Sequence, residues 1–585
     1  MKRFTVFLFS LLMSACFFSG CSGSREAKST EDSVDAGGKD GAGPDQVFSI
    51  EQHDQRLIVD PYGVAPLSAM LVISDARLSQ EQIDEVHISF LDPEHAFSVV
   101  LDYNDEHYAR DYLDPDLLSE SEIGVPLLGL VPDVVNAIDV SIVTADATFS
   151  TQLRVRPAAI DVSLPSISIE RKDESKMEPG FNMAAFYGLA TEHLARPLIY
   201  DHQGVLRWLL LLDRAISPGF ITPVERLKNG NWILGISNVI YEYNMLGREV
   251  ERWVLPIRYK QHHDIFEMPS GNFLVTVTNS EASILDDGEM IPAINDHVLE
   301  VKRDTGQIVN LWNLSEFLDV DRDDLTGADN DSDWLHLNSM IYSADDDSIV
   351  ISGKHQGLAK ITRGGEAGDQ VNKNKHLVWI LAPHVGWNKA GAQGNGMDLA
   401  PYLLSAVDEQ GVPYVDDIQN AVYATDEFEW SFGQHAPLIL PNSHLFVFDN
   451  GTNRDMGDFL FIGYSRGVEY EIRPSISGLG GTVHQVWQYG KERGQELYAP
   501  VISDVDVGAS TGNRFIMPGS YTQKPNGDVG EVARMVEVAY PNKEVVFEAH
   551  LRMQGAHPWE SEICYRQERL SLYPYSRAAS QSPTK

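Results

Sequence analysis

Cysteine is scarce in this chain, with three copies among 585 residues: Cys16, Cys21 and Cys564. The first two lie in or directly after the apolar N-terminal segment, which we interpret below as an export signal. Removal of that segment would leave Cys564 as the one cysteine of the folded body. A disulfide within that body, or a metal cluster held by several cysteines, is therefore excluded.

Positive charge is also scarce, because 45 Lys and Arg residues stand against 85 Asp and Glu residues, a formal net charge of −40 at pH 7. Such a field repels nucleic acids and anionic membrane surfaces, so we expect no nucleic-acid partner. It also disfavours anionic substrates at long range. Chemistry on a sulfate or phosphate ester would therefore need cations and hydrogen-bond donors placed at the site itself.

Long apolar runs are confined to the N-terminus. The chain begins with two basic residues, continues with an apolar run from Phe4 and reaches small residues directly before Cys21. This pattern predicts a secretory signal with a lipobox over 1–21 and lipidation at Cys21, while cleavage near Cys16 or a signal without lipid is the alternative. Residues 22–45 are polar and predict a flexible linker. We expect an exported, periplasmic lipoprotein that meets the membrane only through its lipid anchor.

Residues 46–160 are rich in short segments typical of β-strands. Segments such as DEVHISFLD and NAIDVSIVT alternate apolar and polar residues and are separated by turn residues. We predict a small N-terminal β-sandwich for this region. A linker around 161–179 follows it.

Residues 180–585 contain a loose repeat. Each unit is a strand, a tight polar turn and a second apolar strand, usually followed by a strand with an acidic or aromatic residue. Turns such as Asn229-Gly230 and Ser270-Gly271 fit hairpins. With a further segment at 199–208, we predict an all-β, six-bladed β-propeller, and a solenoid is disfavoured by the large insertions. The clearest units are 225–237, 264–278, 340–354, 437–451 and 505–519.

Several of the 18 histidines open a repeat strand. The first strand of a propeller blade lines the central channel, so His263, His336 and His435 are predicted to face one shared cavity. Side chains alternate along a strand, so we expect only one of His262 and His263 to face the channel, and we favour His263. By the same rule His336 and Asn338 share one face.

A single histidine at such an entry is most simply a structural residue. Three repeats that place histidine at the same phase, with Asn338 and Lys354 close to one of them in sequence, are harder to explain without a ligand. The pattern therefore predicts a binding or catalytic site in the channel.

The motifs HHDIFEMPSGN, DWLHLNSMIYSADDDSIVISGKHQG and FGQHAPLILPNSHLFVFDNG resemble those of the bacterial arylsulfate sulfotransferases, and the resemblance spans most of the chain. It implies a six-bladed propeller after an N-terminal sandwich, and ping-pong transfer of a sulfuryl group from a phenolic sulfate donor to a phenol acceptor through a sulfohistidine. The resemblance implies a homodimer. It implies no nucleotide donor and no other cofactor. Carried over by residue, it implies that His435 is the nucleophile, His263 and His336 its partners, and Asn338 a donor to the sulfuryl oxygens.

One position departs from the family pattern. The motif has arginine where this chain has Lys354, in GKHQG. Lysine keeps the charge of the site but loses the planar fork that binds two oxygens. Two other functions stay open: a catalytically impaired propeller lipoprotein that binds a small molecule or partner, and a metal-dependent sulfate or phosphate ester hydrolase. We expect no metal, since no HExxH-type signature accompanies the histidines.

Overall fold

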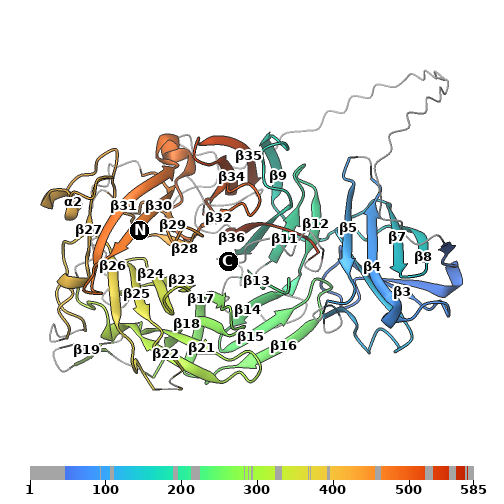
Figure 1. Cartoon of the computed structure of the whole chain (residues 1–585), viewed down its shortest axis with the longest axis horizontal. Coiled ribbons are helices and arrows are strands. Elements are labelled where there is room, and N and C mark those ends of the chain that lie inside the picture. Colours follow the sequence, from blue (N-terminus) through green and yellow to red (C-terminus); the bar gives the residue numbers. More distant parts are fainter. Residues whose placement is uncertain are drawn as a thin grey trace, which may run out of the picture.

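The computed structural model describes residues 46–576 with short gaps (Figure 1). The described residues are nearly all β, which confirms the all-β part of the prediction. No helix among them is long and apolar enough to cross a membrane. The predictions for residues 1–45, including lipidation at Cys21, lie outside the described part. The gaps are 93, 106–107, 109–110, 189–195, 213–223, 282–283, 287–288, 292–293, 323–332, 367, 369, 392–395, 453, 455–462, 521–530, 553–561 and 574–575.

The N-terminal unit consists of a five-stranded and a three-stranded sheet. Buried residues alternate with partly exposed ones along β7, and β3 is buried throughout. The apolar side chains of both sheets belong to one core. In spatial order the sheets are β1 (Val47–Ser49), β8 (Thr148–Val155), β7 (Asn136–Thr144), β4 (Ile83–Phe90) and β5 (Phe97–Asp102), then β2 (Gln55–Val59), β3 (Ser68–Ile73) and β6 (Ile123–Leu128).

This core continues into the rest of the molecule through two stacked tryptophans. The rings of Trp208 and Trp232 lie 5.2 Å apart, and both are fully buried. Trp208 Nε1 and Ser68 Oγ both donate to the carbonyl oxygen of Met245, at 2.8 and 2.9 Å. The N-terminal unit is therefore packed firmly against the sheets that follow it.

Six further sheets of four or five strands contain nearly all of the remaining described strands. In spatial order they are β12 (Leu206–Leu209), β11 (Arg196–Tyr200), β10 (Phe181–Gly188), β36 (Glu562–Leu570); β13 (Glu225–Arg226), β14 (Trp232–Ile236), β15 (Val239–Tyr243), β16 (Glu249–Val254); β17 (Tyr259–Glu267), β18 (Phe273–Asn279), β21 (Asp296–Val301), β22 (Ile308–Asn313); β23 (Leu337–Ser343), β24 (Ser348–Gly353), β25 (Gly357–Thr362), β26 (Leu377–Leu381); β27 (Leu404–Ala406), β31 (Gly481–Tyr489), β30 (Arg466–Pro474), β29 (Leu445–Asp449), β28 (His435–Ile439); β32 (Asp504–Val507), β33 (Arg514–Met517), β34 (Glu531–Ala539), β35 (Glu544–Arg552), β9 (Ser166–Lys172).

The small elements are a hairpin of β19 (Ile284–Asp286) and β20 (Glu289–Ile291), the short helix α2 (Asp416–Gln419) and several 3-10 turns. The predicted hairpins at Asn229-Gly230 and Ser270-Gly271 are present. Gly230 and Gly271 have φ of 78° and 84°, a region that glycine adopts without steric strain. The 3-10 turns are η1 (Gln52–Asp54), η2 (Gln80–Gln82), η4 (Leu314–Glu316), η5 (Ala400–Tyr402) and η6 (Lys491–Leu497).

Two of the six sheets are completed by strands from the far end of the sequence. β36, near the C-terminus, pairs antiparallel with β10, and β9 pairs antiparallel with β35. The first and last parts of this region are therefore hydrogen bonded to one another.

One edge strand from each of five sheets lies beside an edge strand of the next: β17 contacts β23, β23 contacts β28, β28 contacts β32, and β32 contacts β36. Figure 1 shows these strands gathered around a common centre, with the opposite edge strands, such as β16, β22 and β26, toward the outside. Residues at the entries of the inner strands are thereby brought together at that centre.

A buried glutamate in the third strand of four sheets joins each sheet to the next. Glu300 is fully buried, accepts from Asn272 Nδ2 at 2.7 Å, and binds both Arg363 Nε and Nη2, at 2.7 and 2.8 Å. These contacts compensate the desolvation of the carboxylate and connect two sheets. They explain the acidic position that recurs in the repeat. The corresponding pairs are Glu242 with Arg303, Glu469 with Arg514 and Glu537 with Arg569.

Candidate active site

His435 begins β28 and is buried, with 2% of its surface exposed. Its Nδ1 lies 3.0 Å from the carbonyl oxygen of Gly433 and 2.8 Å from Asn450 Oδ1. The Asn450 amide is oriented unambiguously, because its Nδ2 donates to the carbonyls of Ala499 and Ile502 at 2.7 and 2.8 Å. Both neighbours of Nδ1 are thus acceptors, so Nδ1 carries the proton and Nε2 carries the lone pair.

The environment also keeps this imidazole neutral. The pKa of His435 is lowered to about 3, chiefly by burial. Repulsion from His336, Arg566 and Lys354 acts in the same direction, whereas the hydrogen bond to Asn450 opposes the shift. At neutral pH the Nε2 lone pair is therefore not occupied by a proton.

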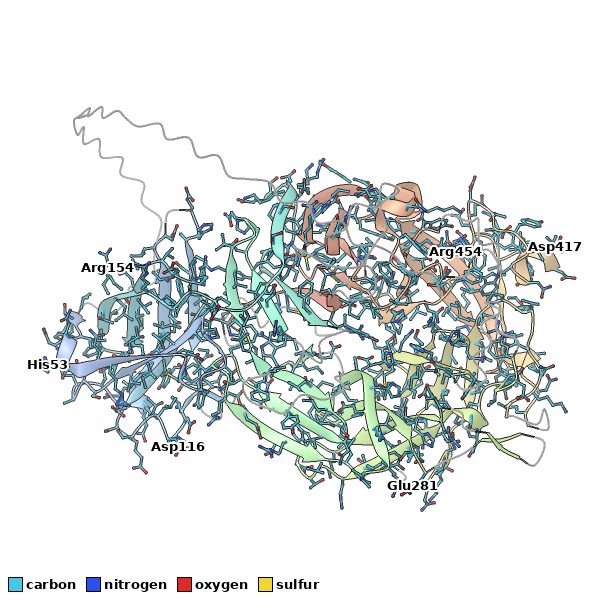
Figure 2. The ribbon with its side chains drawn as sticks, turned by 180° about the vertical axis from the view of Figure 1, so that it is seen from behind. His53, Asp116, Arg154, Glu281, Asp417 and Arg454 are labelled. Atoms are coloured by element: carbon cyan, nitrogen blue, oxygen red, sulfur yellow. The ribbon has the colours of Figure 1, made fainter. Side chains whose placement is uncertain are left out.

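The strand end that carries Asn450 is held by buried ion pairs. Asp449 Oδ2 accepts from Arg454 Nη2 at 2.7 Å and from Arg466 Nε at 2.8 Å. Arg454, labelled in Figure 2, lies among the sheets of the C-terminal half. This network fixes the position of Asn450, and through it the ring of His435.

His263 lies on β17 and meets three aromatic rings. Its ring centroid is 5.0 Å from those of His262 and His336 and 6.0 Å from that of Tyr565. The ring of His435 lies 6.4 Å from the same tyrosine, so Tyr565 contacts both histidines. Burial, and then repulsion from the neighbouring histidines, place the pKa of His263 well below its ordinary value.

His336 is placed differently from the sequence prediction. β23 begins only at Leu337, so His336 precedes the strand, and the register shifts between Leu337 and Ser339. The expectation that His336 and Asn338 share one strand face was therefore wrong. His336 Nδ1 instead lies 2.5 Å from Asp333 Oδ2, within hydrogen-bonding distance of the carboxylate.

Asn338 supports the segment around His435. Its Nδ2 donates to the carbonyl of Gln434 at 2.8 Å, and its Oδ1 accepts from Ser339 Oγ at 2.9 Å. Ser339 Oγ in turn accepts from the backbone N–H of Ala436 at 3.0 Å. The residues on both sides of His435 are thus bound to β23, and the predicted role of Asn338 toward sulfuryl oxygens stays a prediction.

Lys354 follows β24 and is half-buried. Its backbone N–H donates to the carbonyl of His336 at 3.1 Å. Its positive charge contributes to lowering the pKa values of both His435 and Asp333, which places the ammonium in the electrostatic environment of the site. All five site residues predicted from sequence therefore belong to one cluster.

Three inner strands share a backbone distortion, within β17 and at the entries of β23 and β28. His263, His336 and Ala436 have φ of 59°, 50° and 51°, a left-handed region that residues other than glycine seldom adopt. His263 and Ala436 lie within shifts of strand register, and His336 directly precedes the strand whose register shifts between Leu337 and Ser339. Such bulges turn side chains out of the regular alternation and are frequent beside functional sites.

Residues 167–566 match the family model for arylsulfotransferase (ASST). The chain belongs to the arylsulfotransferase family. It is 28% identical over 580 residues to the arylsulfate sulfotransferase AssT of Escherichia coli O6:H1 (strain CFT073), covering 84% of this chain and 89% of that protein. A second relative, AssT of Lelliottia amnigena, is 25% identical over 577 residues with the same coverage. Among solved structures, a Bacteroides caccae protein of unknown function is 11% identical, covers 66% of this chain and all of its own, and has a TM-score of 0.35.

The candidate site of this arylsulfotransferase-family chain also includes residues that the sequence did not reveal. Tyr565 and Arg566 come from β36, and Tyr565 Oη donates to the carbonyl of Asn338 at 3.0 Å. Arg566 is buried and pairs with Glu225 and Asp264. No local pattern marks a strand at the C-terminus as part of the centre, so only its pairing with β10 could have revealed them.

The histidines of the site do not together form a metal-binding group. Among the described residues, one group of His and Asp side chains has ligand atoms within 4.8 Å of one another: Asp333, His336 and His355. It includes neither His263 nor His435. Two ligands of a tetrahedral zinc, with bonds of about 2.0 Å, lie about 3.3 Å apart, so the 2.5 Å between Asp333 and His336 fits a hydrogen bond better.

Proposed function

We propose that this protein transfers a sulfuryl group from a phenolic sulfate ester to another phenol, with His435 as the group that becomes transiently sulfated. One observation carries the proposal: two acceptors hold Nδ1 of a buried, neutral His435, so the nucleophilic lone pair is on Nε2. A nitrogen nucleophile of this kind divides one difficult displacement into two easier ones.

In the first step Nε2 of His435 attacks sulfur, the N–S bond forms, and the bond between sulfur and the phenolic oxygen breaks. The electron pair of the broken bond leaves with the phenolate. In the second step the oxygen of the acceptor phenol attacks the same sulfur and the N–S bond breaks. A histidine of the site takes up the hydroxyl proton of the acceptor phenol. The overall exchange consumes one sulfate ester and one phenol and produces one of each, in a ping-pong order.

The remaining side chains fit supporting roles. His263 and His336 are placed to exchange the phenol proton, a contribution typical of histidine. Lys354 supplies a positive charge for the sulfuryl oxygens, and Asn338 a further N–H donor as well as its structural bonds. No cofactor is required in this scheme.

We extend the proposal to the architecture and location of the protein. The six sheets around a common centre are interpreted as the blades of a β-propeller, and the N-terminal unit as a β-sandwich. Residues 1–21 are proposed to direct export to the periplasm, with lipid on Cys21 as the anchor and residues 22–45 as the linker. A homodimer is also proposed, and size-exclusion chromatography with light scattering tests it.

A chromogenic aryl sulfate, incubated with and without phenol and with and without a chelator, tests the proposal. Phenol-dependent release of the chromogenic phenol that survives the chelator is expected. Release that needs a metal but no acceptor would favour the ester hydrolase, and absence of any release would favour a binding protein. His435→Asn should abolish release, whereas His444→Asn, which alters a histidine paired with Glu469 away from the cluster, should not.

A further inference from the structure

His262 and His263 form the start of a chain that leads from the site to a carboxylate. Nδ1 of His262 lies 2.8 Å from Nδ1 of His263, and Nε2 of His262 lies 3.2 Å from Oδ1 of Asp296. His262 and Asp296 are both buried, with exposed fractions of 8% and 1%. The other carboxylate oxygen of Asp296 accepts from the backbone N–H of Leu337 at 2.9 Å, next to His336.

This chain addresses a difficulty in the chemistry of His263. A histidine that exchanges a proton with phenols must accept it during one half of the cycle. The pKa of His263 is held well below its ordinary value by burial and by repulsion from His262, His336, His435 and Arg566. A positive charge on His263 itself is therefore strongly disfavoured, and the charge has to be stabilised elsewhere.

We propose that His262 and Asp296 form a proton relay behind His263, so that the charge of the transferred proton resides on His262 beside the carboxylate. The inference rests on the proposed sulfuryl transfer. The carboxylate that follows His263 in sequence, Asp264, is not available for this role because its oxygens bind Arg566 Nη2 at 3.1 Å and the N–H of Met340 at 2.8 Å.

The hydrogen bond between two Nδ1 atoms requires one proton between them, which defines two states of the relay. When the acceptor phenol attacks sulfur, its proton moves to His263 Nε2, and the proton on His263 Nδ1 moves to His262 Nδ1. His262 is then an imidazolium, and its charge lies beside the carboxylate of Asp296, whose Oδ1 is 3.2 Å from Nε2. When the next donor ester is cleaved, the leaving phenolate takes the proton from His263 Nε2, and His262 returns its Nδ1 proton. No proton is gained or lost over the cycle.

His262→Gln separates a relay from a purely structural contact. The glutamine oxygen can accept from His263 Nδ1 and keep its orientation, but it cannot take up the proton. A nitrophenolate is a weak base that leaves without protonation, so its burst from a nitrophenyl sulfate should stay within about 2-fold of the wild type. Transfer to unsubstituted phenol, whose proton must be removed, should fall by about 100-fold, the scale of general acid–base catalysis.

Asp296→Asn provides the second variant, because the amide oxygen can still accept from Leu337 while the charge is lost. It should show the same selective loss with weakly acidic phenols. His444→Gln is the matched control, since it removes another histidine paired with a glutamate. Equal losses with acidic and weakly acidic phenols, or no loss with either, would overturn the relay. Failure of the wild type to form sulfo-His435 would instead overturn the proposed function.

Discussion

Replacement of Asn450 by alanine tests how the protein activates His435. The Nδ1–H of His435 donates to Asn450 Oδ1 at 2.8 Å and to the carbonyl of Gly433 at 3.0 Å. The imidazole gains positive charge as Nε2 binds sulfur, so these hydrogen bonds strengthen in the transition state. A hydrogen bond to a charged group contributes about 1.5–3 kcal/mol, which corresponds to about 10- to 150-fold in rate.

Because Gly433 still accepts from Nδ1 in Asn450→Ala, we expect a loss in the lower part of this range, about 10- to 30-fold in the rate of sulfation. The variant also leaves the buried carbonyl of Ile502 without its amide donor, at about 1–3 kcal/mol, whereas the carbonyl of Ala499 still accepts from Ser465 Oγ at 3.3 Å. The free energy of unfolding should therefore fall together with the rate.

The assay is stopped-flow release of nitrophenolate in a single turnover, without acceptor, at a temperature where circular dichroism shows the variant folded. Asn442→Ala is the control, since Asn442 is an exposed asparagine in the turn between β28 and β29. A folded Asn450→Ala protein with the wild-type rate of sulfation would refute the assignment of Nδ1 and Nε2.

Four further outcomes are expected. Lys354→Met should lower kcat/KM by about 100-fold, whereas Lys354→Arg, which keeps the charge, should stay within about 10-fold of the wild type; equal loss in both would deny a role for charge. The pKa of His435 is about 3 in the folded protein and 6.5 in its ordinary state, so between these pH values the unfolded chain binds one more proton than the folded protein. The free energy of unfolding should therefore fall by about 1.4 kcal/mol per pH unit from this group as the pH is lowered from 6.5 toward 3. In thermal melts His435→Asn should flatten that slope, and an unchanged slope would contradict the lowered pKa. Glu300→Ala should lower the free energy of unfolding in denaturant by about 3–5 kcal/mol because Arg363 loses its buried partner, and a loss below about 1 kcal/mol would contradict this. Chelators should leave activity unchanged, and a loss that added zinc restores would favour the metal-dependent hydrolase.

Much of the fold follows from local patterns. The paired strands of the repeat, and hairpin turns such as Asn229-Gly230, were predicted because tight turns and alternation are properties of neighbouring residues. The pairing of β9 with β35 and of β36 with β10 was not, since it joins segments separated by most of the chain. Tyr565 and Arg566 escaped prediction for this reason.

The candidate site was predicted in its members but not in its geometry. His263, His336 and His435 were chosen from their common phase in the repeat, and they do gather around Tyr565 and one another. The prediction of regular alternation failed at His336, because His336 itself has a left-handed backbone and a bulge follows it at the start of the strand. No glycine at these positions indicates the distortion in the sequence. Hydrogen-bond partners such as Asn450 depend on how the strands pack in three dimensions. The periodicity of the sequence carries no information on that packing.

The central claim is the covalent intermediate on His435, and mass spectrometry of the protein quenched after reaction with an aryl sulfate alone tests it most directly. Sulfohistidine is labile in acid, so quenching and digestion are done at alkaline pH. We predict an increase equal to one SO3 group, located on the peptide that contains His435, which disappears when phenol is added before quenching. Turnover of the ester with an unmodified His435, or an adduct on a different residue, would contradict the account.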